Sequence, residues 1–373
     1  QRETPGALTA LCGCWSQIDP AEAAALGADV LFGTGDRQGF VRAVETAAAE
    51  RGAKESVTKL DDPFRRTGFE ELPAGAYAGH ARAYLKIQDG CDNFCAYCII
   101  PYARGRVLSL PEERCAAEAA ALEAQGFREI VVTGIEIASW GKDLKNGKTL
   151  IDALEAVAAG APKARLHLGS LEPTVVTYAF TERLAKLSVC PHFHLSLQSG
   201  CDATLKRMNR RYTSGEYYEK CMLIRRYFKH PALTTDVIVG FPGETEEEFE
   251  ITREFLNKVD FYETHIFQYS KRKGTKAAVM ENQIPSAVAH ARSACLIADG
   301  KVRRKRFEEE LCGKETQVLF EESVQIDGKI YASGHTMEYV RMLMETEEKL
   351  DNCLVMAVPQ KERCQEWMLC RRV

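Results

Sequence analysis

The stretch RAYLKIQDGCDNFCAYC, from Arg82 to Cys98, runs from a predicted strand directly into a loop with three cysteines, Cys91, Cys95 and Cys98. A structural zinc site or a closed iron–sulfur cluster uses four protein ligands. The next cysteine, Cys115, falls inside a predicted helix. Three thiolates can hold three irons of a 4Fe–4S cluster and leave the fourth iron open for a non-protein ligand. The alternative is a zinc site that a distant histidine or cysteine completes.

Strands and helices alternate six times from Ala81 to about Gln268. The predicted strands are RAYLKIQ, EIVVTG, RLHLGS, HFHLSLQ, ALTTDVIVG and THIFQYS. The predicted helices cover residues 112–125, 150–159, 174–187, 202–208, 215–227 and 245–259, and Thr245 with Glu248 forms a capping box on the last one. Six such units predict an α/β fold with a parallel, barrel-like sheet, in which active sites lie at the carboxyl ends of the strands. The cysteine loop follows the first strand, and this position favours an open cluster over zinc.

Two further regions flank this barrel. Residues 8–49 show two strand and helix pairs, around ALTALCG and ADVLFGT, which are too few strands for an independent parallel sheet. Residues 52–79 are polar and are predicted to be a linker. After a helical segment that ends near Gly313, five short strand patterns (316–322, 329–335, 338–345, 353–359 and 367–373) predict a small all-β barrel.

The composition narrows the class of protein. The formal charge of the 373 residues is -4, so a nucleic-acid surface has to be local rather than general. No run of eighteen apolar residues occurs, which predicts no membrane contact, and no signal peptide is visible. The 14 cysteines lie mostly alone in apolar stretches. This favours the reducing cytoplasm over a secreted disulfide framework.

Several blocks of the sequence together resemble the radical S-adenosylmethionine (SAM) enzymes, and more closely their methylthiotransferase branch. The C-x3-C-x2-C motif in KIQDGCDNFCAYCIIPYARG carries the resemblance. It is supported by TGIEIASWGKD, LHLGSLEP, SLQSGCDATLKRMNRRYT, DVIVGFPGETEEEFE and SGHTMEYVRM. Within the branch, the blocks KIQDGCDNFCAYCIIPYARG and TGIEIASWGKD together are most similar to enzymes that act on threonylcarbamoyladenosine beside the tRNA anticodon, at position 37.

The resemblance implies three domains. Residues 1–65 would be the carboxyl-terminal part of an α/β methylthiotransferase domain, residues 77–310 a partial (β/α)6 radical SAM barrel, and residues 313–373 a TRAM domain. It also implies two 4Fe–4S clusters in the complete protein. One binds SAM and cleaves it to a 5'-deoxyadenosyl radical, which takes the hydrogen from C2 of the modified adenine. The other delivers a methylated sulfur, with flavodoxin or ferredoxin as electron donor and tRNA as substrate.

The resemblance assigns Cys91, Cys95 and Cys98 to the SAM-binding cluster and Cys14, in GCWSQ, to the second cluster. The other two ligands of the second cluster are expected before Gln1, so the sequence is expected to be incomplete at its amino terminus. Cys12 matches no ligand position of the family. The alternative for Cys14 is a buried structural thiol.

Five polar residues at or near strand ends are the candidates for SAM contacts: Glu136, Ser170, Gln198, Arg210 and Asp236. Glu172 and Ser196 share two of these strand ends and remain open as alternatives. Arg210 suits a carboxylate because a guanidinium can bind it with two hydrogen bonds. Asp236 lies among apolar residues and needs a partner or a ligand. For Glu136 the alternative is a helix-start acid, and for Arg210 a solvated helix-end cation.

Three basic runs are candidates for contacts to RNA phosphates: 206–211, 271–276 and 303–306. Each run is as compatible with a solvated face. After Gly313 acids outnumber bases, so Tyr331, His335 and Tyr339 are predicted to stack on RNA or, alternatively, to pack in the core. The competing functions are methylthiolation of a ribosomal-protein aspartate and, in another class, a zinc- and RNA-binding protein without catalysis.

Overall fold

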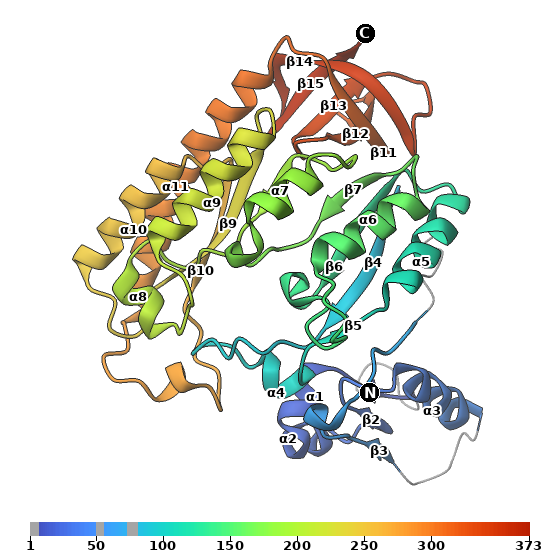
Figure 1. Cartoon of the computed structure of the whole chain (residues 1–373), viewed down its shortest axis with the longest axis vertical. Coiled ribbons are helices and arrows are strands. Elements are labelled where there is room, and N and C mark those ends of the chain that lie inside the picture. The colour runs from blue at the N-terminus through green and yellow to red at the C-terminus, as the bar shows by residue number, and fades with distance from the viewer. Residues whose placement is uncertain (1–6, 50–55, 73–80) are drawn as a thin grey trace.

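The computed structural model describes residues 7–49, 56–72 and 81–373. Figure 1 shows the blue amino-terminal part at one end of the molecule, the red carboxyl-terminal barrel at the other end, and the large α/β part between them. The carboxyl ends of the central strands point toward the amino-terminal part. This arrangement places the loop after the first strand next to the amino-terminal part.

Six parallel strands form the central sheet. They are β4 (Arg82–Asp89), β6 (Glu129–Gly134), β7 (Arg165–Leu168), β8 (His192–His194), β9 (Ala232–Val239) and β10 (Glu263–Gln268). They neighbour one another in this order, with β7 and β8 joined by the bridges Leu166–Val189 and Leu171–Leu195. The predicted partial (β/α)6 barrel is therefore confirmed. A short antiparallel strand, β5 (Leu108–Ser109), pairs with β4 and was not predicted.

Helices that follow these strands along the chain cover one face of the sheet (Figure 1). They are α5 (Glu112–Ala124), α6 (Leu150–Gly160), α7 (Tyr178–Leu184), α8 (Asp202–Arg207), α9 (Ser214–Tyr227), α10 (Glu246–Val259) and α11 (Ser286–Leu311). The predicted capping box of Thr245 and Glu248 is present. The single helix predicted over 174–187 is wrong. A 3-10 turn, η3 (Pro173–Val175), comes first, and Thr177 then caps a separate helix by accepting from the Phe180 amide.

The two faces of the sheet differ in chemistry because side chains alternate along a strand. On one face Leu85, Ile87 and their equivalents on the other strands are buried in the main core against the helices. The opposite face carries Lys86, His194 and Asp236, among other polar residues. A barrel filled with apolar side chains would be inert there. The polar face instead leaves groups that can bind ligands.

The amino-terminal part is a three-stranded parallel sheet with helices. Its strands are β1 (Ala10–Leu11), β2 (Val30–Phe32) and β3 (Val57–Lys59), and its helices are α1 (Cys14–Ile18), α2 (Pro20–Ala25) and α3 (Arg37–Ala49). The prediction that 52–79 is a linker is wrong for residues 56–72, because β3 and a 3-10 turn, η1 (Pro63–Arg65), lie there, while 52–55 and 73–79 lie outside the described residues. All three residues of β3 are exposed, so the sequence lacks the alternation of apolar and polar residues that would predict a strand here. It adds the third strand that the sequence pattern lacked.

The last five strands close into the predicted small barrel. They are β11 (Thr316–Ile326), β12 (Lys329–Thr336), β13 (Arg341–Glu345), β14 (Cys353–Cys364) and β15 (Trp367–Arg372). Buried Phe320, Met342 and Met368 belong to its core.

This barrel packs against the amino ends of the parallel strands. Arg82 at the start of β4 pairs with Glu321 at 2.7 Å, and the Tyr339 ring lies 4.1 Å from the His167 ring of β7. His335 stacks on Tyr339, and Tyr331 is buried. The prediction of stacking on RNA is therefore wrong for the buried Tyr331. His335 and Tyr339 pack against protein rings, as the alternative has it, and RNA contact at their partly exposed edges stays a prediction.

Candidate active site

The loop with three cysteines is held in place by backbone contacts on both sides. Gly90 precedes Cys91 with φ +71°, and a Cβ there would lie 1.8 Å from the Arg106 carbonyl oxygen, so only glycine fits. The Cys91 amide donates to the Gly105 carbonyl at 3.1 Å. The Ala96 amide donates to the carbonyl of Met208 at 2.9 Å, beside the end of α8. These contacts fix the path of the loop between β4 and the end of α8.

Arg210 lies at the centre of the site. Its guanidinium is 6% exposed and donates to Cys95 Sγ at 3.2 Å, to Glu172 Oε2 at 2.6 Å and to the Ser196 carbonyl at 3.2 Å. Burial raises the pKa of Glu172, although the charge of Arg210 opposes this shift. Arg210 is thus no solvated helix-end cation. The structure brings it to the cysteine loop, as predicted for a SAM-binding residue.

Glu136 follows β6 and is tied to β4 by its backbone, whose amide donates to Gln88 Oε1 at 2.7 Å. Its carboxylate accepts from the Ala138 amide at 3.1 Å and from Ser139 Oγ, and so caps the 3-10 turn η2 (Ile137–Ser139). The helix-start alternative thus describes its contacts. Its charge is still close enough to raise the pKa of Glu172, after the larger effect of burial.

The remaining candidates are spread over the same end of the sheet. Ser170 is exposed in the turn after β7. Gln198 is buried at 8% exposure with φ +72°, a left-handed conformation that costs a non-glycine residue of order 1–3 kcal/mol and is frequent at functional sites. Asp236 directs its carboxylate to His194 Nε2, at 3.3 Å. The structure therefore gathers Arg210, Glu172 and Glu136 around the loop and places Asp236 deeper along the strands.

Comparisons with known proteins place this site in a family. The radical SAM superfamily model matches residues 85–256. The threonylcarbamoyladenosine tRNA methylthiotransferase MtaB of Bacillus subtilis (strain 168) is 34% identical over 354 residues, which covers 94% of this chain and 77% of that protein. The chain belongs to the tRNA methylthiotransferase family of radical SAM proteins.

Two other similar proteins are named for different activities. The tRNA-2-methylthio-N(6)-dimethylallyladenosine synthase of Moorella thermoacetica is 33% identical over 370 residues, covering 98% of this chain and 82% of that protein. The solved radical SAM methyltransferase TsrM from Kitasatospora setae is similar with a TM-score of 0.45 and 18% identity, over 52% of this chain and 38% of that chain. The family therefore includes relatives with at least two tRNA nucleosides in their names.

The thiols fit the iron–sulfur cluster that a radical SAM protein carries. Cys91, Cys95 and Cys98 are each partly buried, and none of them is in a disulfide. Burial raises the pKa of Cys91 to about 12. The Cys91 sulfur also accepts from the Asn93 amide at 3.5 Å. Membership of the radical SAM superfamily favours a 4Fe–4S cluster over the single zinc of the alternative.

Cys14 lies close to the helix that follows the cysteine loop. It begins α1, and α1 packs against α4 (Ile100–Arg104), which starts directly after the cysteine loop. Thr34 Oγ1 donates to the Ala103 carbonyl at 2.5 Å and fixes this contact. Cys12 is exposed in the link between β1 and α1, so the two thiols share no strand face. Cys14 is half-buried beside the helix that follows Cys98.

The three basic runs differ in how exposed their side chains are and in whether those side chains pair with acids. In the second run Lys271, Arg272 and Lys276 are exposed, and the loop lies beside the cysteine loop because the Ala277 amide donates to the Ala96 carbonyl at 2.8 Å. The first run is divided, since Arg210 is buried in the site and Arg207 pairs with Glu248. Exposed basic side chains near the cysteines therefore come from the second run and from Lys206 and Arg211 of the first run.

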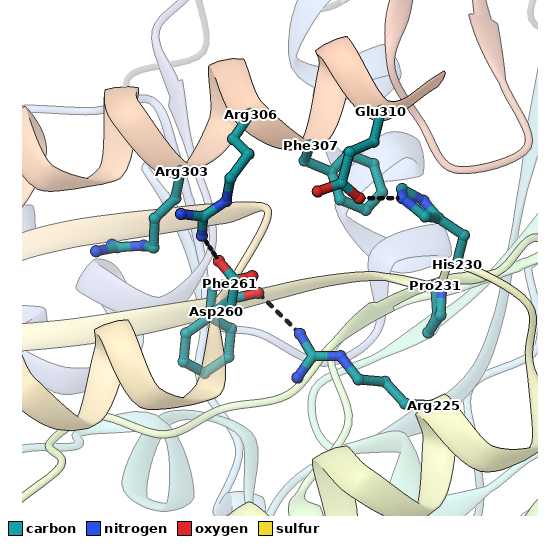
Figure 2. A pocket seen from close by; sticks show the side chains of 9 residues that line it. All are labelled: Arg225, His230, Pro231, Asp260, Phe261, Arg303, Arg306, Phe307 and Glu310. Atoms are coloured by element: carbon teal, nitrogen blue, oxygen red, sulfur yellow. Dashed lines mark hydrogen bonds and ion pairs between the residues drawn. The ribbon is translucent and has the colours of Figure 1, made fainter. Parts of the chain in front are cut away.

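Figure 2 shows Arg303 and Arg306 of the third run at a pocket of about 300 Å³, which Asp260 and Arg225 also line. Arg306 pairs with Asp260, and Arg225 of α9 donates to the Asp260 carbonyl at 2.8 Å. Arg303 is 4% exposed. The prediction of a phosphate track over 303–306 is therefore wrong for Arg303, and Arg304 pairs with Glu308 at 2.8 Å.

Sequence reasoning missed two residues that hold the site together. Gln88 is fully buried, and its amide donates to the carbonyls of Asp89 and Gly90 at 2.7 and 2.8 Å. Asp89 pairs with Lys86 and lies 3.6 Å from both Arg104 and Arg37, so it joins the barrel to the amino-terminal part. The available signal was two polar residues at the end of an otherwise apolar strand.

Within the described ranges no helix combines the length and the apolar character that crossing a membrane requires.

Proposed function

We propose that this chain methylthiolates C2 of N6-threonylcarbamoyladenosine at position 37 of tRNA by radical SAM chemistry. The observation that carries the proposal is the loop of Cys91, Cys95 and Cys98 at the carboxyl end of β4, with the buried Arg210 guanidinium donating to Cys95 at 3.2 Å. The MtaB relative named for this nucleoside supports it. The choice of nucleoside rests on the blocks KIQDGCDNFCAYCIIPYARG and TGIEIASWGKD, since a dimethylallyladenosine relative is about as similar.

The cysteines would hold a 4Fe–4S cluster, which supplies, when it is bound, the electron that cleaves SAM. Arg210 suits the SAM carboxylate because it is already oriented by Glu172 and the Ser196 carbonyl. Glu136 and Glu172 offer negative charge for the SAM ammonium group. Gln198 and Ser170 remain candidates for the adenosine part.

Apolar side chains around the loop keep water from the reacting groups. Buried Ala96, Met208, Phe241 and Ala277 form a small core, and Tyr97 packs edge-on against Phe241. A reactive carbon radical needs such a dry site, because it would otherwise attack whatever lies near. The loop thus serves both as ligand carrier and as part of the wall.

The rest of the chain serves the substrate and the second cluster. We assign residues 1–65 to the methylthiotransferase domain, 77–310 to the radical SAM core and 313–373 to a TRAM domain. Cys14 supplies one ligand of the second 4Fe–4S cluster in the complete protein. Exposed Lys271, Arg272 and Lys276 approach tRNA phosphates beside the site. Flavodoxin or ferredoxin supplies electrons, and the reaction takes place in the cytoplasm.

The triple replacement of Cys91, Cys95 and Cys98 by Ala tests the cluster. After anaerobic reconstitution with iron and sulfide, the native chain is expected to be brown and to convert SAM to 5'-deoxyadenosine. The variant is expected to lose both properties, while Cys353→Ala, which removes an exposed thiol, keeps them. Retained SAM cleavage in the triple variant, or colourless native protein with stoichiometric zinc, contradicts the proposal.

Nucleoside analysis tests the substrate. In tRNA from cells that lack this gene, mass spectrometry should show that the methylthio group on threonylcarbamoyladenosine is gone. Loss of the methylthio group from dimethylallyladenosine, or from a ribosomal-protein aspartate, would instead assign the chain to another branch of the family.

A further inference from the structure

Three side chains on adjacent strands form a group of potential metal ligands: His194 of β8, Asp236 of β9 and His265 of β10. Of these, only Asp236 is also a candidate SAM contact. Their ligand atoms all lie within 4.8 Å of one another, and no other three His, Cys, Asp or Glu residues in the described ranges meet this criterion. Asp236 is the register partner of His265, and His194 that of Thr234, two residues before Asp236. Because side chains alternate along strands, all three project from the same polar face.

The geometry of His194 suits metal binding. Its Nδ1 lies 3.0 Å from Thr234 Oγ1. When Nδ1 carries the proton and donates to this hydroxyl, Nε2 presents its lone pair, which is the arrangement that orients histidine ligands of metals. Nε2 is buried and has no hydrogen-bond partner. In that tautomer the Nε2 lone pair faces the Asp236 carboxylate with no hydrogen between them, an arrangement that a cation would stabilise.

The distances fit one ion. His194 Nε2 and Asp236 Oδ2 are 3.3 Å apart, and two ligands of a tetrahedral ion with bonds of 2.0–2.1 Å lie roughly 3.4 Å apart. The His265 ring stacks on the His194 ring with 5.6 Å between their centroids. His265 is exposed on the edge strand, so its ring is free to turn toward the other two ligands.

We propose that His194, Asp236 and His265 bind a divalent transition-metal ion such as Zn²⁺, in a site of two histidines and one carboxylate that is separate from the cysteine loop. Imidazole and carboxylate ligands suit zinc and ferrous iron, and three protein ligands leave positions open on the ion. The site lies one strand repeat, about 6.7 Å, below Ser196, whose carbonyl contacts Arg210. The open positions therefore face the same polar side of the sheet as the SAM candidates. This inference does not depend on the proposed reaction.

The experiment uses the full chain with its iron–sulfur cluster reconstituted. After incubation with ZnCl₂ and dialysis, metal analysis is expected to find one zinc per chain, and X-ray absorption at the zinc edge should show nitrogen and oxygen ligands only. His265→Ala and Asp236→Asn should lose this zinc. The matched control His290→Ala removes another exposed histidine, on α11, and should keep it.

A second variant probes the orienting contact. Thr234→Val removes the hydroxyl beside His194 Nδ1 and should weaken zinc binding 10- to 100-fold, as measured by competition with a chelator. Circular dichroism confirms that each variant is folded. Zinc bound through sulfur, zinc retained by His265→Ala, or no zinc in the native chain overturns the inference. Displacement of the zinc by SAM would also overturn it, because Asp236 would then bind SAM instead of a metal ion.

Discussion

Arg210 illustrates how one residue links the cysteine loop to the strand ends. A buried guanidinium is stable only with partners that satisfy its charge and its planar donors. Glu172, the Ser196 carbonyl and Cys95 Sγ supply them. The fork geometry of arginine reaches three different elements at once, which a lysine cannot do.

We therefore expect Arg210→Lys to weaken SAM binding to the reconstituted protein about 10- to 100-fold, because a charge-assisted hydrogen bond contributes about 1.5–3 kcal/mol. Equilibrium dialysis with labelled SAM measures the effect, and iron content should be unchanged. The matched control is Arg211→Lys, since Arg211 is the exposed neighbour. Equal SAM affinity of the two variants would contradict the role of Arg210.

Glu129 forms a buried ion pair with Arg165, at 2.6 Å between Oε2 and Nε. We expect Glu129→Gln to lower the free energy of unfolding by about 3–5 kcal/mol, because Arg165 keeps a buried charge without its partner. Chemical denaturation measures this loss. Glu182→Gln, which removes an exposed carboxylate paired with Lys186, should cost less than about 1 kcal/mol.

The same pair predicts a dependence on pH. Burial by itself raises the pKa of Glu129, but the His167 ring and the Arg165 guanidinium outweigh it and leave the pKa lowered. A lowered pKa stabilises the fold above the unfolded value of about 4.3. The difference in stability between native protein and Glu129→Gln should therefore persist at neutral pH and shrink as the pH falls below that value. A constant difference down to pH 3 would show that the charge is not the cause.

At the scale of elements, the turn between β12 and β13 joins the small barrel to the parallel strands. Tyr339 holds φ +69° in this turn, and its ring contacts the rings of His167, His192 and His335. Each aromatic contact adds about 0.5–1.5 kcal/mol beyond the burial of area. The barrel is thereby fixed to the amino ends of the strands, away from the cysteine loop.

We expect Tyr339→Ala to destabilise this contact by about 2–4 kcal/mol. In differential scanning calorimetry the variant should unfold in two transitions, the small barrel first, whereas the native chain unfolds in one. Tyr178→Ala removes an exposed ring on α7 and serves as control. A single, unshifted transition in Tyr339→Ala would mean that the two parts are coupled by other contacts.

At the scale of the whole molecule, the 49 lysines and arginines are divided between ion pairs within the chain and exposed positions. Many of these side chains pair with acids within the chain, as Arg207 does with Glu248 and Arg304 with Glu308. The loop with Lys271, Arg272 and Lys276 stays exposed beside the cysteines. Its position favours contact with a polyanion at the mouth of the site.

Replacing Lys271, Arg272 and Lys276 together by Ala should weaken tRNA binding. The plot of log affinity against log salt should also become less steep by about 2, the value for three lost phosphate contacts. Fluorescence anisotropy at several salt concentrations measures both quantities. SAM cleavage without tRNA should be unchanged. The control replaces Lys163, Lys186 and Lys229, three exposed lysines elsewhere on the chain, and an equal loss in that control would reduce the effect to net charge.

Local patterns were sufficient for much of this structure. Apolar strands and the capping box of Thr245 and Glu248 depend on contacts within a few residues, so these elements were predictable from the sequence alone. The exposed strand β3 was not, because only its pairing with β2 makes it a strand. The helix predicted over 174–187 begins later than expected, because Pro173 starts a 3-10 turn and Thr177 caps the helix that follows.

Pairings between distant residues were decided by the tertiary structure. Glu172 meets Arg210, and Tyr339 meets His167, only because the order of the strands brings their ends together. His194, Asp236 and His265 lie on three strands whose register no local pattern specifies. The sequence by itself determined which residues can bind metal or charge, since that is a property of each side chain. Which of them share a site depends on how the sheet closes, because a shift of one residue in register would turn each side chain to the other face.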